Sequence, residues 1–203
     1  DPSRVARIRQ EFGQNEKMIV MLARVSPVKN HLRMIGILKA LTEMRRSVRS
    51  KLHIVGSGDR AYLDQIAAQV ESLGLSPYVV HHGEVRNPID YAAAADVLVL
   101  PSLSEGLPGA VLEALSCGTP VVASDCPGVM EIRERTLGVS TLSLSDDDKV
   151  WAEAIVSAMM SVDRNAITKS FLRSEFVFDK HLEKMLEVWG LLRAESAIKA
   201  VPG

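Results

Sequence analysis

Short apolar runs alternate with longer helical patterns along most of this 203-residue chain, and this alternation constrains the fold more than any other feature. Residues spaced three or four apart over 32–44 and 63–73 predict amphipathic helices. Five apolar runs have the length and composition of buried strands, at residues 18–23, 51–55, 78–82, 96–100 and 120–123. The alternation predicts an α/β fold, a Rossmann-like parallel sheet with helices on both faces. Ligands are expected at the carboxyl ends of its strands.

Beyond residue 125, the pattern predicts a short helix over 128–135, an irregular strand over 137–144 and helices over 146–161 and 180–194. We expect the Rossmann-like domain to occupy residues 1–175 and the C-terminal helical segment residues 176–203. Asp146, Asp147 and Asp148 precede a helix, where carboxylates cap free N–H groups, and a metal cluster is the alternative. His81 and His82 are adjacent on a predicted strand and face opposite sides, so they cannot share one ion. We therefore predict no metal site.

Composition is that of an ordinary globular protein, with 47% hydrophobic and 24% charged residues. A net charge of −1, with no basic stripe interleaved with aromatics, argues against a nucleic-acid partner. The basic cluster over 45–51 follows a helical segment, and we interpret it as a solvated face that complements the helix dipole. Cys117 and Cys126 lack CxxC spacing and suggest no disulfide scaffold, so a reducing cytosol is the simpler compartment.

Two carboxylates, Glu105 and Glu113, lie eight positions apart across a Gly/Pro turn that opens into a helical pattern. Eight residues span a little over two helical turns, so Glu113 points to nearly the same side as the helix start, where Glu105 lies. A first-turn Pro108 is tolerated there. Free N–H groups at this N-terminus suit a phosphate, and they belong to Gly106, Leu107, Gly109 and Ala110. The spacing predicts a binding site for a polyhydroxylated, anionic ligand. The ordinary alternative is a solvated helix start that carries acidic residues.

Three segments surround this turn: ADVLVLPS, EGLPGAVLEAL and CGTPVVASD, in one block over residues 95–125. The block resembles the retaining nucleotide-sugar glycosyltransferases of family four, which share the glycosyltransferase B fold of two facing Rossmann-like domains. The resemblance extends from about residue 18 to the C-terminal helices. It covers the donor-binding half of that architecture and no acceptor-binding half.

The resemblance implies roles for four charged residues. In the family, an Arg and a Lys five residues apart, followed by Gly or Asn, hold the nucleotide diphosphate, and Arg24, Lys29 and Asn30 fill these places here. Arg binds phosphate bidentately and Lys adds a point charge, so the pair can neutralise a leaving diphosphate without a metal. A turn with solvated charges is the alternative. Glu105 would accept hydrogen bonds from donor-sugar hydroxyls, and Glu113 would hold the ribose.

Two further loops are weaker candidates for nucleotide contact. The segment GSGDRA, residues 56–61, satisfies GxGxxA, but it follows the second strand and lacks an acid at the expected spacing, so a dinucleotide site is not favoured. By the resemblance, Gly58 lines the nucleotide pocket, and a plain tight turn is the alternative. Val85 and Asn87 occupy the place where the family's backbone meets the base, and a surface turn fits them equally well.

The activity implied is transfer of a sugar from a nucleoside diphosphate sugar to an acceptor, with retention of configuration and no cofactor, in polysaccharide, lipopolysaccharide or glycolipid synthesis. The acceptor would be held by a missing N-terminal domain, toward which the helix over 180–194 would cross. The chain alone would bind donor without efficient transfer. Its expected location is cytoplasmic, with peripheral membrane contact through the absent domain. An NAD-binding oxidoreductase domain and a non-catalytic interaction module are the alternatives.

Overall fold

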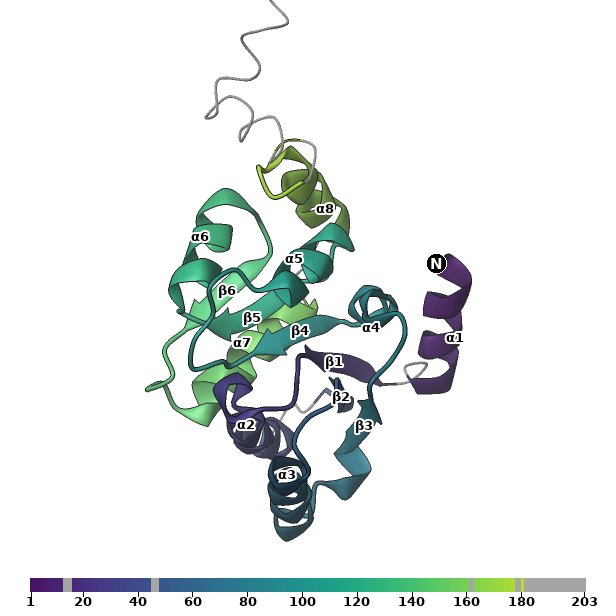
Figure 1. Ribbon diagram of the computed structural model, residues 1–203, viewed down its shortest axis with the longest axis vertical. Helices are drawn as coiled ribbons and strands as arrows, with labels where there is room; N and C mark the ends of the chain where they lie inside the picture. The colour runs from purple at the N-terminus through teal and green to yellow at the C-terminus, as the bar shows by residue number, and fades with distance from the viewer. Residues whose placement is uncertain (13–15, 45–47, 161–162, 178–179, 181–203) are drawn as a thin grey trace, which may run out of the picture.

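The computed structural model describes residues 1–12, 16–44, 48–160, 163–177 and 180. Within them one six-stranded sheet has the order β3-β2-β1-β4-β5-β6, and every neighbouring pair is parallel (Figure 1). The strands are β1 (Lys17–Leu22), β2 (Ser50–Val55), β3 (Val79–Gly83), β4 (Val97–Leu100), β5 (Val121–Ser124) and β6 (Val139–Leu142). The α/β Rossmann-like prediction is therefore confirmed, and the first five strands match their predicted ranges to within one residue at each end.

Helices cover both faces of this sheet. They are α1 (Pro2–Phe12), α2 (His31–Glu43), α3 (Arg60–Ser72), α4 (Pro88–Ala94), α5 (Gly109–Ser116), α6 (Pro127–Arg135), α7 (Asp148–Met160) and α8 (Arg164–Arg173), with short 3-10 turns at Pro27–Lys29 and Ser76–Tyr78. Sequence patterning did not reveal α1, which buries no residue, or the seven-residue α4. The predicted helix over 180–194 lies outside the described residues, apart from Lys180. Among the described helices, none has the length and apolar composition needed to cross a membrane.

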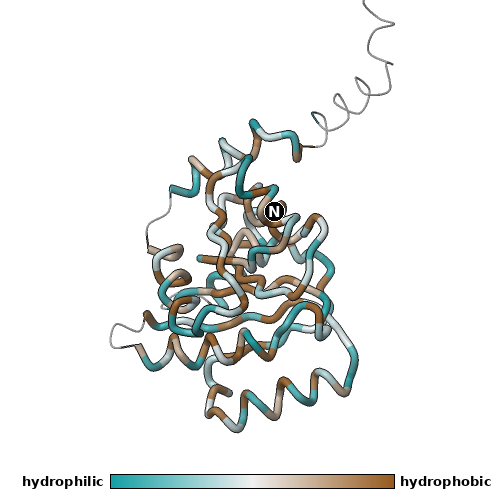
Figure 2. The backbone as a smooth tube through the Cα atoms, turned by 90° about the vertical axis from the view of Figure 1, so that its left-hand side faces the viewer, coloured by the Kyte–Doolittle hydropathy of each residue, from teal (hydrophilic) through white to brown (hydrophobic). Residues whose placement is uncertain are grey.

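Alternate strand residues enter two separate cores, as a period of two requires. Ile19 and Met21 of β1 pack toward α2, α3 and α7, where the fully buried Trp151 donates its indole N–H to the Ser143 carbonyl at 3.1 Å. Met18 and Val20 pack toward α4, α5, α6 and α8. Figure 2 shows brown and teal stretches alternating along the helices, because each helix turns one apolar face to its core.

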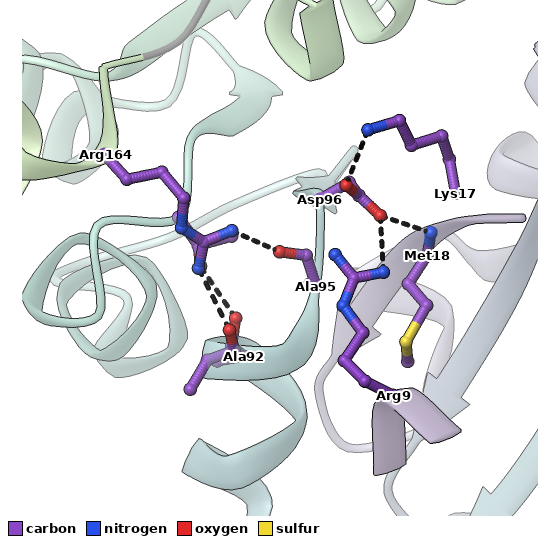
Figure 3. A network of polar contacts seen from close by, with 9 residues as sticks. Arg9, Lys17, Met18, Ala92, Ala95, Asp96 and Arg164 are labelled. Atoms are coloured by element: carbon purple, nitrogen blue, oxygen red, sulfur yellow. Dashed lines mark hydrogen bonds and ion pairs between the residues drawn. The ribbon is translucent and has the colours of Figure 1, made fainter. Parts of the chain in front are cut away.

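Two polar clusters fasten the outer helices to the segment between α4 and β4 (Figure 3). Asp96 accepts hydrogen bonds from Arg9 of α1 at 2.8 Å, from Lys17 at 3.0 Å and from the Met18 N–H at 2.8 Å. Burial raises the pKa of Asp96, but these donors outweigh burial and hold that pKa below its usual value. Arg164, the first residue of α8, donates to the Ala95 carbonyl at 2.7 Å. Both ends of the domain are therefore tied to one central loop.

Two charge interpretations hold only in part. Of the three acids at the start of α7, Asp147 accepts from a backbone N–H of the first turn, that of Lys149 at 2.8 Å, which confirms the predicted cap. Asp148, the first residue of the helix, instead pairs with Arg33 of α2 at 3.1 Å. In the basic cluster, Lys51 lies on β2 and its ammonium group pairs with the Glu16 carboxylate at 2.8 Å. Its partner is therefore a side chain and not the C-terminal end of a helix. Part of that cluster, residues 45–47, lies outside the described residues.

A histidine cluster lies on one face of the sheet edge. The Nδ1 of His53 on β2 lies 3.0 Å from the Nε2 of His82 on β3, and the Tyr91 hydroxyl lies 3.3 Å from the other nitrogen of His82. Phe12 of α1 contacts both imidazole rings edge-on. His81 points away from this cluster, with its Nε2 3.0 Å from the Gly56 carbonyl. The two adjacent histidines therefore do face opposite sides of the strand.

The buried histidines predict acid sensitivity of the fold. Burial lowers the pKa of His53 to about 4, helped by the positive charges of His82 and Lys51, and burial lowers the pKa of His31 to about 4. In the unfolded chain both titrate near 6.5, so it binds more protons than the folded chain between these values. We expect the free energy of unfolding to be fully retained above pH 6.5 and to decline as the pH falls to about 4. Urea denaturation at several pH values should show a shallower decline in a His53→Leu variant, and an unchanged slope would contradict this account.

Candidate functional site

The loops that follow β1 and β4 form the centre of the site. These strands are neighbours in the sheet although far apart in the chain, and the connections after them run in opposite directions along the sheet, to β2 and to β5 (Figure 1). Their carboxyl ends are therefore the switch point of the topology, where ligands of open α/β sheets bind. Lys29 from the first loop places its Nζ 2.7 Å and 2.8 Å from the two carboxylate oxygens of Glu105 in the second. Their side chains are 24% and 7% exposed. Two predicted site residues separated by 76 positions are therefore in direct contact.

Asn30 explains the sequence pattern around Lys29. It ends the short turn Pro27–Lys29, starts α2, and adopts the left-handed conformation, with φ 58° and ψ 44°. Glycine and asparagine tolerate this conformation better than other residues. A Gly or Asn after the lysine is thus a backbone requirement, and the departure from the commoner glycine leaves the loop geometry intact.

Arg24 lies at the start of the same loop and is exposed. Within the described residues, its guanidinium has no hydrogen-bond or ion-pair partner, in contrast to Arg9 and Arg164, which bind protein groups. An exposed guanidinium at a strand end is available to an anion from solvent. The structure does not show Arg24 in contact with Lys29, and a joint role stays a prediction.

Glu113 lies within α5 and is half-buried. Its carboxylate has no hydrogen-bond or ion-pair partner in the part of the chain that the structure describes, and burial raises its pKa above 4.5. A half-buried carboxylate without a partner destabilises a fold, so its presence is typical of a ligand site. Since Glu105 precedes α5, the first turn of that helix contains no acid, which argues against the alternative of an acidic helix start.

The start of α5 differs slightly from the prediction. The helix begins at Gly109, and Pro108 is its N-cap residue, one position before the first turn. Gly109 and Ala110 occupy the first two helical positions, whose N–H groups have no acceptor inside the helix. Gly106 and Leu107 precede the helix in the loop that starts at Glu105. All four are exposed or half-buried, so their N–H groups remain candidates for a phosphate.

Gly58 has a packing role that the sequence did not reveal. It forms a parallel bridge with Val25, and a Cβ at Gly58 would lie only 1.9 Å from the Val25 carbonyl oxygen. The loop after β2 therefore supports the loop that carries Arg24 and Lys29. Asp59 accepts hydrogen bonds from the first N–H groups of α3, at 3.0 Å and 3.2 Å. A pyrophosphate would need those groups, so the dinucleotide interpretation of this segment is not supported.

Val85 and Asn87 follow β3 at the same edge of the sheet. Val85 packs partly against the second core, so its backbone, more than its side chain, is free to face a ligand. Asn87 precedes α4 without capping it through its side chain. Contact of either residue with a base stays a prediction.

Gly128, at the start of α6, is a residue that sequence reasoning missed. A Cβ there would lie 1.4 Å from the carbonyl oxygen of Gly106. The loop after β5 therefore presses directly on the loop of Glu105, which only a glycine permits. The sequence signal was a glycine just inside a predicted helix, where this residue type is otherwise unfavourable.

The family model of "Glycosyl transferases group 1" matches residues 16–161, which include both central loops and α5. The chain belongs to the group 1 glycosyltransferases. The putative glycosyltransferase EpsF of Bacillus subtilis is 34% identical over 138 residues, which are 68% of this chain and 34% of that protein. A GDP-mannose-dependent alpha-(1-6)-phosphatidylinositol monomannoside mannosyltransferase of Mycolicibacterium smegmatis is 34% identical over 142 residues, 64% of this chain and 36% of that protein.

Several solved structures share the fold of this group 1 chain. Anabaena Alr3699/HepE in complex with UDP and glucose has a TM-score of 0.74 and 22% identity, covering 99% of this chain and 53% of that one. A glycosyltransferase from Rickettsia africae has a TM-score of 0.79 and 17% identity, covering 93% and 52%. The chain thus spans about half of these structures and about a third of the two curated relatives.

The contact at Gly128 predicts that Gly128→Ala displaces the Glu105 loop. The added methyl group overlaps backbone atoms that cannot rotate away, so we expect a loss of about 1–3 kcal/mol in the free energy of unfolding. Gly109→Ala is the matched control, because nothing lies within 4 Å of a Cβ there. Chemical denaturation of the two variants should separate them. Equal stabilities would show that the loops do not press together in solution.

The unpaired carboxylate predicts that Glu113→Gln stabilises the protein at neutral pH. Burial raises the pKa of Glu113, so its ionised form is disfavoured in the folded chain above that pKa. We expect the variant to melt at a higher temperature at pH 7, and this gain to shrink as the pH falls through the raised pKa toward the unfolded value, 4.5, and to vanish below it, where both states become protonated. Thermal melting at pH 7 and pH 4 tests this, and a destabilised variant at pH 7 would contradict it.

Proposed function

We propose that this chain is the donor-binding part of a retaining glycosyltransferase that uses a nucleoside diphosphate sugar. One observation carries the proposal: at the switch point of the sheet, a lysine suited to phosphate and a carboxylate suited to sugar hydroxyls are held within 3 Å of each other. They lie beside the N-terminus of α5, whose free N–H groups attract anions.

In this proposal the cations stabilise the leaving group. Lys29 and the exposed Arg24 bind the diphosphate, whose negative charge grows as the bond to the sugar breaks, and the N–H groups of Gly109 and Ala110 add to them. At an effective dielectric near 20, one close charge pair is worth about 4 kcal/mol before desolvation. These residues supply positive charge from the protein itself, which supports a metal-independent reaction.

The carboxylates bind the donor and do not attack it. Glu105 accepts hydrogen bonds from sugar hydroxyls near the reacting carbon, and Glu113 accepts them from the ribose, which would give its unpaired carboxylate a partner. Glu105 already accepts hydrogen bonds from Lys29 and, at 2.6 Å, from the Ser102 hydroxyl. These contacts favour a role as hydrogen-bond acceptor over a role as nucleophile. Retention would then follow from attack on the front face of the sugar, assisted by the leaving phosphate.

The relatives support a nucleoside diphosphate donor without selecting the base. UDP is named in the Anabaena complex, and GDP-mannose in the name of the Mycolicibacterium relative. The chain covers only about half of the solved structures, so we assign the acceptor site to an N-terminal domain outside this chain. Synthesis of polysaccharide, lipopolysaccharide or glycolipid on the cytoplasmic side, with membrane contact through that domain, remains part of the proposal.

A thermal-shift panel tests the proposal. The chain is melted with UDP, GDP and ADP and with their sugars, since a ligand at 100 times its dissociation constant stabilises by about 2.7 kcal/mol. We expect one base to shift the melting temperature and Arg24→Ala to weaken that nucleotide at least about tenfold without lowering stability, because this side chain is exposed and unpaired among the described residues.

The control cation for this panel is Lys51. It lies near the amino end of β2, whereas the candidate site lies at the carboxyl ends of the strands. Lys51→Ala should leave the affinity for the nucleotide unchanged. No shift with any nucleotide, or an equal loss of affinity in the two variants, would contradict the proposal.

Sugar transfer should need more than this chain. Holding an acceptor oxygen against the donor supplies much of the rate, and the sheet described here forms one wall of a crevice. We expect the chain to bind its nucleotide sugar and to hydrolyse it slowly at most. The measurement is product formation with a range of acceptors, with and without an N-terminal half supplied from a relative. Efficient transfer by the chain alone would place an acceptor site within it.

A further inference from the structure

Glu105 lies in a loop and not in a helix or strand, so its carboxylate must be oriented by its neighbours. Two side chains do this. Lys29 contacts both oxygens, at 2.7 Å and 2.8 Å, and the Ser102 hydroxyl donates to Oε1 at 2.6 Å. With 7% of its side chain exposed, the carboxylate depends on these donors for the solvation it has lost.

Ser102 is fixed more firmly than Lys29. It is fully buried, and its carbonyl accepts hydrogen bonds from the Ser124 hydroxyl at 2.6 Å and the Cys126 thiol at 3.5 Å. The next residue, Leu103, donates its N–H to the Val28 carbonyl at 2.8 Å, which joins the loop to the one before Lys29. Lys29, in contrast, carries its charge on a flexible stem with three donors.

This arrangement conflicts with a bound donor in one respect. The proposed function requires Lys29 to bind the diphosphate and Glu105 to bind the sugar. In the structure, however, the two side chains form an ion pair with each other. When a diphosphate draws Lys29 away, Ser102 is the one side chain of the described residues that still donates to Glu105.

Resting on the proposed function, we propose that donor binding exchanges the Lys29–Glu105 ion pair for a Lys29–diphosphate contact, and that Ser102 is the positioning residue that keeps Glu105 directed at the sugar through the exchange. The ion pair then competes with the diphosphate. The hydroxyl of Ser102 matters only for ligands that carry a sugar, because only these contact Glu105.

Two consequences can be measured by calorimetry with the 203-residue chain, using UDP with UDP-glucose and GDP with GDP-mannose. Glu105→Gln removes the competing charge and should tighten the free nucleoside diphosphate severalfold. Ser102→Ala should leave that affinity unchanged and weaken the nucleotide sugar about tenfold, as expected for a lost hydrogen bond to a charged group. Ser102→Thr keeps the hydroxyl and should restore the affinity for the sugar.

A double variant separates positioning from general damage to the fold. If Ser102 acts through Glu105, Ser102→Ala should not alter the ratio of the two affinities once Glu105→Ala has removed the acceptor of its hydrogen bond. Ser174→Ala is the matched control, because Ser174 is also buried and donates to a backbone carbonyl, that of Phe171 at 2.7 Å, but lies after α8. It should leave the ratio unchanged in either background.

The outcomes distinguish this inference from the function on which it rests. Equal loss of affinity for both ligands in Ser102→Ala would overturn the exchange while the donor site stands. The same holds for an undiminished effect of Ser102→Ala in the Glu105→Ala background, and for weaker diphosphate binding by Glu105→Gln. Failure of the unchanged chain to bind UDP, GDP, ADP or any of their sugars would overturn the proposed function as well.

Discussion

Close backbone contact between successive loops at the carboxyl edge of the sheet is the constraint on which the site depends. The Gly56 N–H donates to the Gly83 carbonyl at 2.8 Å, and Val25 bridges to Gly58. On the other side of the switch point, Gly128 lies against Gly106. Each loop is therefore supported by its neighbour across the sheet, which gives side chains on loops a defined geometry without placing them on helices or strands.

The charges of the chain divide into two kinds. Asp96, Arg164 and Lys51 bind other protein groups and hold elements together. Arg24 and Glu113 have no such partners among the described residues, and burial raises the pKa of the second. The Lys29–Glu105 pair lies between these kinds: it links the loops after β1 and β4, and it joins the two groups that, in the proposed function, a nucleotide sugar would separate. A site built this way gives up some stability to remain able to bind.

Much of this could be predicted from the sequence. The strands are buried apolar runs whose period fixes which face each residue enters, so their positions followed directly. The block over 95–125 identified the family, which the family model then showed independently. Helix α1 was missed because only three apolar residues, Val5, Ile8 and Phe12, mark the face that it packs against the core, and they are only partly buried. Pro108 was placed one residue too far into α5. The charge cluster near residue 51 was misread because the partner of Lys51, Glu16, is far away in the chain and is brought beside it only by the pairing of β1 with β2.

The sequence by itself determined the α/β fold and the family, because these follow from local periodicity and from motifs contained in short segments. From the same motifs it predicted the residues proposed to bind a diphosphate and a sugar. The tertiary structure alone decided that Lys29 and Glu105 touch, that the Ser102 hydroxyl donates to the Glu105 carboxylate and that Gly128 must lack a side chain. Each of those facts joins residues far apart in the chain or depends on the path of a loop. Such contacts are set by the order of strands in the sheet, which no local pattern encodes.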